Sequence, residues 1–163
     1  MIDILFDDDV DASQLPEVEK IEEAVAAACR EAGLPGKIEL CIRFCDDAEV
    51  HRLNQQWRGL DKPTDVLSFP MQDGPDYDSN ESLGDIVIAV PYTAHEAERL
   101  GLGMAQHTLH LIVHGTLHLL GYDHMKEDEA EVMQAAESNA MQRLGLHAPY
   151  EKQVEIAKGA EGV

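Results

Sequence analysis

The stretch HGTLHLLGYDH, residues 114–124, is the part of this 163-residue sequence around which the fold is organised. Residues four apart lie one turn apart on the same face of a helix, so His114 and His118 can bind one metal ion together. Gly121 stands where the helix should end, because glycine adopts the left-handed conformation at low cost. The returning chain then brings His124 toward the other two histidines. This spacing predicts three nitrogen ligands and an open fourth position, as in a catalytic zinc site.

The expected metal is zinc, one ion per chain, and nickel or copper would also bind three nitrogen ligands. Metzincin proteases have the same histidine spacing, with a glutamate after the first ligand as general base. This chain has Gly115 in that place, so peptide hydrolysis by that mechanism lacks its base. Cleavage of RNA does not need that glutamate, because the 2′-hydroxyl is a built-in nucleophile.

Two further histidines precede the pair on the same predicted helix, residues 104–120. For His110 we predict a hydrogen bond that supports a metal ligand or a contact with substrate, and for His107 a surface or capping position. In the last predicted helix, residues 127–144, we place Glu129, Glu131 and Glu137 on the outer face.

Other polar residues have more than one interpretation. Asp85 lies inside the apolar run LGDIVIAV, residues 83–90, and we predict that it bonds a loop or a metal-binding histidine. Asp123 would be a fourth ligand if the metal site were closed and structural. Arg58 fits two roles equally well: a fork that binds phosphate, or a partner for Asp61 or Asp65 in the turn that follows it.

The periodicity of apolar residues predicts four strands and about five helices in one domain, residues 1–150, followed by a flexible tail, residues 151–163. The predicted strands are residues 2–6, 37–45, 65–69 and 83–90, and the predicted helices are residues 16–32, 47–57, 91–100, 104–120 and 127–144.

Composition limits the classes of function. The formal net charge of −20 argues against non-specific binding of nucleic acid by the surface as a whole. Six of the twelve basic residues fall between Arg30 and Lys62, so a local cationic cleft remains compatible with the sequence. The chain has no apolar run of the roughly 18 residues that a membrane span needs, and no basic signal region at its acidic start. We expect a cytoplasmic protein without a membrane partner.

The stretch at 114–124, together with LNQQWRGLDKPTDVLSFP at 53–70 and LGDIVIAV at 83–90, strongly resembles the bacterial YbeY family. Members of this family are single-strand-specific endoribonucleases and ribosomal RNA maturation factors. The resemblance covers most of residues 35–145. It implies a zincin-like α+β domain with a small, mostly parallel four-stranded sheet, a zinc ion held by His114, His118 and His124, and a functional role for Arg58.

The resemblance therefore favours a zinc-dependent endoribonuclease that acts on the 3′ end of 16S ribosomal RNA and in ribosome quality control, with Arg58 and His114 as catalytic residues. It implies partners among the small ribosomal subunit, its proteins and a ribosome-associated GTPase. Two alternatives are a metalloprotease-like hydrolase and a ribosome assembly factor without catalysis, in which the zinc is structural.

Overall fold

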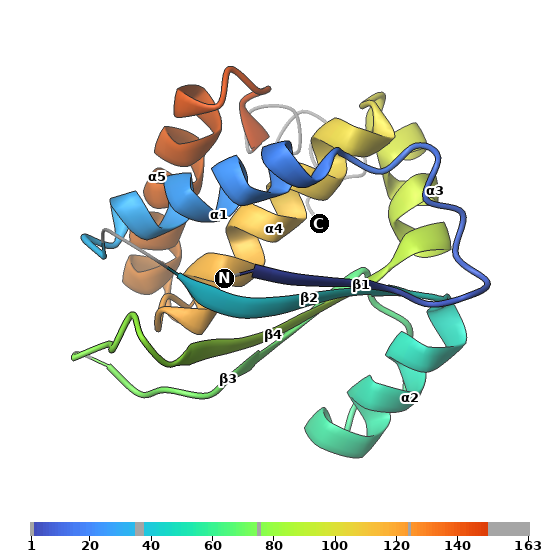
Figure 1. The fold of residues 1–163 in the computed structure, drawn as a ribbon, viewed down its shortest axis with the longest axis horizontal. Helices are drawn as coiled ribbons and strands as arrows, with labels where there is room; N and C mark the ends of the chain where they lie inside the picture. Colours follow the sequence, from blue (N-terminus) through green and yellow to red (C-terminus); the bar gives the residue numbers. More distant parts are fainter. Residues whose placement is uncertain (1, 35–37, 75, 124, 150–163) are drawn as a thin grey trace.

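The computed structural model describes residues 2–34, 38–74, 76–123 and 125–149, and within these ranges the chain forms one four-stranded sheet and five helices (Figure 1). This confirms the predicted α+β class. The predicted tail, residues 151–163, lies outside the described ranges, so the division of the chain at residue 150 stays a prediction. The strands are β1 (Ile2–Phe6), β2 (Glu39–Cys45), β3 (Val66–Pro70) and β4 (Ser82–Ala89), and the helices are α1 (Val18–Glu31), α2 (Asp47–Arg58), α3 (Val90–Leu100), α4 (Met104–Leu119) and α5 (Glu127–Arg143).

The strands are ordered β1-β2-β4-β3. β1, β2 and β4 run parallel, and β3 pairs with β4 in the antiparallel direction. The sheet is therefore mostly parallel, as predicted, and its one antiparallel strand forms an edge. The polar segment between β3 and β4 joins these two neighbours, whereas the parallel pairs are joined through helices.

The two faces of the sheet are covered differently (Figure 1). Helices α1, α4 and α5 lie on one face, where Ile42 and Ile86 belong to the main core. On the other face lies α2, and Val50 packs there with Leu67 and Val87 in a smaller cluster. Because neighbouring strand residues point to opposite faces, β2, β3 and β4 contribute to both clusters, whereas β1 packs on the main core alone. The second face is covered only in part, and a groove remains open beside α2.

The end of α4 has the geometry that its glycine predicts. Gly121 has a φ of 93°, and its N–H donates to the carbonyl of His118 at 3.1 Å. The N–H of Tyr122 donates to the carbonyl of Leu117 at 3.0 Å. These two bonds form a Schellman motif, which ends the helix and turns the chain back over its last turn.

None of the helices in the described ranges is both long enough and apolar enough to cross a membrane. The mostly buried α4 packs against β3 and β4 and contacts α1, α3 and α5. Its histidines are therefore carried by a tightly packed helix.

Candidate functional site

His114 and His118 face each other on α4, as their spacing predicts. Their Nε2 atoms are 3.0 Å apart, and their ring centroids are separated by 4.5 Å. Both side chains are partly buried, so the pair lies at the surface of the core and not inside it.

The other nitrogen of each ring, Nδ1, faces a hydrogen-bond acceptor. Nδ1 of His118 lies 3.0 Å from the carbonyl oxygen of Tyr122, which can only accept, so this nitrogen carries the proton. Nδ1 of His114 lies 2.7 Å from Oε1 of Glu137. Burial acts to raise the pKa of Glu137, but hydrogen bonds from His110 and His114 outweigh it and lower the pKa to about 2. The ionised carboxylate therefore also accepts.

It follows that both Nε2 atoms are unprotonated when the rings are neutral, so two lone pairs converge on the same small region. Lone pairs that face each other at 3.0 Å repel unless a cation lies near both. Two nitrogens bound to one tetrahedral zinc ion lie about 3.3 Å apart, for Zn–N bonds of about 2.0 to 2.1 Å. The histidine pair therefore fits a metal ion through both Nε2 atoms.

The third predicted ligand, His124, lies outside the described residues. Among those that the structure describes, no three His, Cys, Asp or Glu side chains gather closely enough to hold a metal ion. Asp123, the proposed ligand of a closed site, is exposed and borders a groove with Tyr122, Asp128 and Glu129. The whole ligand set, including His114 and His118, stays a prediction.

Gly115 has a packing reason that sequence spacing alone does not reveal. A Cβ atom at this position would lie 3.1 Å from Cγ2 of Ile86 and 3.1 Å from Oγ of Ser68. Here α4 presses against β3 and β4, so a side chain would point into the sheet. The space that a glutamate side chain at position 115 would need is therefore occupied by Ile86 and Ser68. This packing counts against a protease mechanism of the metzincin type.

Arg58 is the last residue of α2 and is exposed. Its Nη2 donates to the carbonyl oxygen of Ser68 at 3.3 Å, and it forms no ion pair with any residue that the structure describes. Asp61 lies instead 2.7 Å from Nε2 of His51, and Asp65 accepts from the N–H of Val66 at 2.8 Å. Of the two predicted roles for Arg58, the structure leaves the phosphate fork open and provides no ion pair in the turn.

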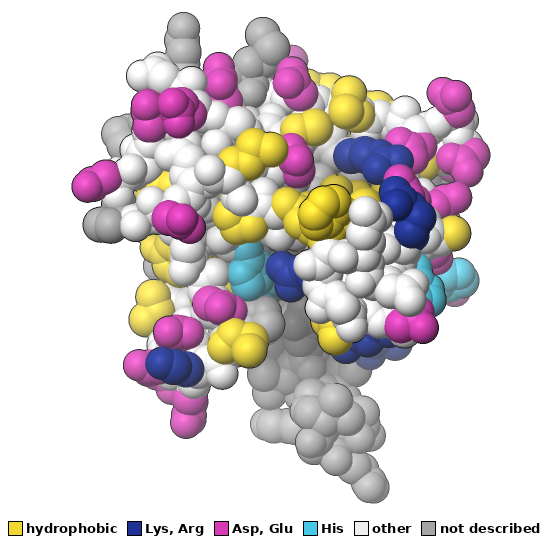
Figure 2. Space-filling view, turned by 90° about the horizontal axis from the view of Figure 1, so that it is seen from below, with side chains coloured by type: hydrophobic (Ala, Val, Ile, Leu, Met, Phe, Trp, Pro, Cys, Tyr) yellow, Lys and Arg dark blue, Asp and Glu magenta, His cyan; other side chains and the backbone are white. Residues whose placement is uncertain are grey.

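Ser68 connects Arg58 to the histidine helix. Its carbonyl oxygen accepts from Arg58, and its hydroxyl lies against Gly115, the neighbour of His114. Figure 2 shows a histidine side chain exposed beside a basic side chain near the middle of the face seen from below, between acidic and apolar groups. Through Ser68, β3 thus contacts both Arg58 and the helix that carries the histidine pair.

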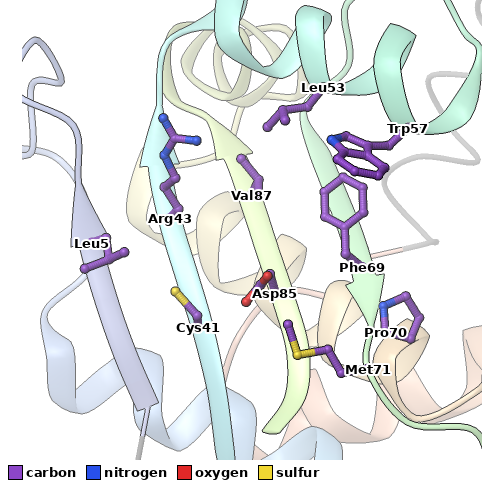
Figure 3. Close-up of a pocket in the computed structure, with 10 residues that line it drawn as sticks. All are labelled: Leu5, Cys41, Arg43, Leu53, Trp57, Phe69, Pro70, Met71, Asp85 and Val87. Atoms are coloured by element: carbon purple, nitrogen blue, oxygen red, sulfur yellow. The ribbon is translucent and has the colours of Figure 1, made fainter.

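Asp85 lies away from the histidines. Its neighbour Ile86 points to α4, so Asp85 points to the opposite face of the sheet. There it borders the groove beside α2, a cavity of about 520 Å³ (Figure 3). Burial raises the pKa of its carboxyl, which makes no hydrogen bond to the described residues. No contact of Asp85 with the residues that the structure describes supports the predicted bond to a loop or to a metal-binding histidine. The groove is lined mostly by apolar side chains: Leu5, Leu53, Trp57, Phe69, Met71 and Val87.

Two predictions about polar residues were wrong. His107 is buried, with 3% of its surface exposed, and burial lowers its pKa to about 4. Glu137 is fully buried on α5, although we placed it on the outer face. One signal was available: Met133, Glu137 and Met141 are spaced by four, so a buried stripe through the methionines includes the glutamate.

His110 does contact the supporting group of the site. Its Nε2 lies 2.7 Å from Oε2 of Glu137, whose other oxygen faces His114. His110 thus reaches His114 indirectly, through a carboxylate that the sequence analysis missed, and its role toward the metal or the substrate stays a prediction.

Residues 6–145 match the family model described as endoribonuclease YbeY. The endoribonuclease YbeY of Azorhizobium caulinodans is 43% identical over 152 residues, covering 91% of this chain and 95% of the relative. That of Rhizorhabdus wittichii is 47% identical over 142 residues, covering 78% of this chain and 83% of the relative. The solution structure of TM1509 from Thermotoga maritima is similar, with a TM-score of 0.56 and 26% identity over 88% of this chain and 91% of that one. The chain that carries this histidine pair therefore belongs to the endoribonuclease YbeY family.

Proposed function

We propose that this protein is a metal-dependent endoribonuclease that cleaves single-stranded RNA and acts in the maturation of the 3′ end of 16S ribosomal RNA. The observation that carries the proposal is the pair of converging Nε2 atoms of His114 and His118, together with the guanidinium of Arg58, which has no ion pair among the described residues. Membership of the endoribonuclease YbeY family supports it.

In this proposal His114, His118 and His124 hold one divalent cation, which we expect to be zinc. When bound, such an ion supplies Lewis-acid chemistry at a phosphate oxygen. The fork of Arg58 binds the oxygens of the phosphate at the cleavage site, because a guanidinium matches phosphate in bidentate geometry and keeps its charge. The RNA contributes the nucleophile through its 2′-hydroxyl. The protein then acts mainly by holding charge and orienting the phosphate.

The packing at Gly115 makes the protease alternative less favourable. The alternative of an assembly factor with a structural zinc requires a fourth protein ligand, for which Asp123 is the candidate. We further propose that the protein works in the cytoplasm, on the small ribosomal subunit, with small-subunit proteins and a ribosome-associated GTPase as partners.

The decisive experiment maps the 3′ end of 16S ribosomal RNA in cells that lack the protein, complemented with the wild type or with Arg58→Ala. We expect the wild type to restore the mature end and the variant to leave a precursor. Arg52→Ala is the matched control, because Arg52 is exposed on the same helix and bonds Glu49 and Gln56. In purified form, the wild type and Arg52→Ala should cleave single-stranded RNA, and Arg58→Ala should not. Loss of cleavage in Asp123→Ala would favour a ligand role for Asp123. Full processing by Arg58→Ala would refute the proposal.

A further inference from the structure

Glu137 is a fully buried carboxylate with two histidine partners. It lies on α5 between Met133 and Met141, which are also buried. Transfer of a carboxylate into such surroundings is costly unless hydrogen bonds compensate for the lost water. Here both oxygens are used: Oε2 faces Nε2 of His110 and Oε1 faces Nδ1 of His114, each at 2.7 Å.

The two histidines are one turn apart on α4, so the carboxylate spans one helical turn and ties α5 to α4. A bond to one ring would be enough to join the helices. The second bond has a separate consequence, because it fixes both the rotation and the tautomer of His114. A neutral imidazole has one N–H, and when Nδ1 donates to Glu137, only Nε2 retains a lone pair.

We propose that Glu137 is a positioning residue of the metal centre: it holds His114 in the Nδ1–H tautomer with Nε2 directed at the ion, while His110 holds the carboxylate from the other side. This inference rests on the metal site of the proposed function. The negative charge next to His114 also strengthens the ring as a ligand, as carboxylate partners of metal-binding histidines do elsewhere. His110 then acts on the site without touching the metal or the RNA.

The isosteric change Glu137→Gln tests the geometry. A glutamine has one acceptor and one donor, so it can satisfy only one of the two rings in the present arrangement. If the NH₂ group of the glutamine faces His114, Nδ1 of that ring must accept a hydrogen bond. Nε2 then carries the ring proton and has no lone pair for the metal. We expect the affinity for zinc, measured on the full chain by competition with a chromophoric chelator, to fall 10- to 100-fold.

The matched control is Glu131→Gln, which removes the same charge from an exposed position of the same helix. It should bind zinc within twofold of the wild type. A Glu137→Gln protein that binds zinc as tightly as this control would overturn the inference.

A second measurement does not depend on any variant. The ¹⁵N shifts of His114 in the folded, metal-free wild type should show a protonated Nδ1 and an unprotonated Nε2, the tautomer that leaves Nε2 available to the metal. The opposite tautomer would overturn the inference even if Glu137→Gln fails to fold. Cleavage of RNA is measured separately: a wild type that binds zinc and has the expected tautomer but cleaves no RNA refutes only the proposed function.

Discussion

The guanidinium of Arg58 donates to the backbone carbonyl oxygen of Ser68, at 3.3 Å, across the outer edge of β3. This oxygen is neutral, so the contact itself does not compensate the charge of Arg58, and the described residues leave most of its donors available. The residue is therefore held by β3, and within the described part of the chain it has no ion pair that a phosphate would have to displace. Several effects of substitutions depend on this geometry and on the packing around α4.

Arg58→Lys keeps the positive charge but loses the planar fork. We expect the rate of single-turnover RNA cleavage to fall roughly tenfold, and about a hundredfold in Arg58→Ala, since one or both hydrogen bonds to a charged phosphate are lost. Both variants should unfold in urea within about 0.5 kcal/mol of the wild type, because Arg58 is exposed. Equal cleavage by the lysine variant and the wild type would mean that charge alone is needed.

Gly115→Glu restores the residue found in metzincins but should not create a peptidase. The new side chain would enter the contact with Ile86 and Ser68 and bury a carboxylate without a partner. We expect a loss of about 3 kcal/mol or more in the free energy of unfolding, measured by urea denaturation. Gln134→Glu, at an exposed position of α5, is the control for the added charge and should be nearly neutral. A stable variant that cleaves peptides would contradict this account of Gly115.

Gly121→Ala should weaken metal binding as well as the fold. An alanine is strained at a φ of 93°, and its Cβ would lie 2.9 Å from the hydroxyl of Tyr77. The turn also sets the carbonyl of Tyr122 that fixes His118, so we expect roughly tenfold weaker zinc binding, measured by chelator competition, and a loss of about 1 kcal/mol or more in stability. Gly33→Ala is the control, because Gly33 has a φ of 73° with nothing within 4 Å of the added Cβ. It should lose stability and keep its zinc affinity; equal effects on zinc binding would disprove the link through Tyr122.

Acid should destabilise the protein partly through His107. Burial lowers the pKa of this histidine from 6.5 to about 4, so the unfolded chain binds the proton more readily than the folded one. The stabilising effect of a neutral His107 is therefore complete above pH 6.5 and is lost as the pH falls toward 4, by about 3 kcal/mol at most. Urea denaturation at several pH values, with a chelator present, should show a shallower loss for His107→Leu than for the wild type. Parallel pH profiles for the two proteins would show that His107 is not the responsible group.

The sequence allowed the helices and strands to be placed closely, because their apolar residues repeat with clear helical or strand periods and their ends carry glycine or proline. The histidine pair was also predictable, since a spacing of four on a helix determines which side chains meet. The end of α4 at Gly121 was predictable as well, because glycine adopts the left-handed conformation that such a turn needs.

The environment of the polar side chains was harder to predict. Glu137 is charged, and a charged residue on a terminal helix is normally exposed, so its burial depends on two histidines more than twenty positions earlier in the chain. Asp85 lies in an apolar strand, and the strand period alone does not tell which face carries the metal site. These are tertiary relationships, which one sequence without the fold does not contain.

The outer edge of β3 has one more consequence, for solubility. An exposed strand edge can pair with a strand of another molecule, which is a route to aggregation. In this protein the side chain of Arg58 occupies the carbonyl of Ser68 on that edge, and the strand ends two residues later at Pro70, whose nitrogen has no proton to donate. The arginine that we assign to RNA thus also occupies a backbone acceptor of this edge, which leaves one group fewer with which a strand of another molecule could pair.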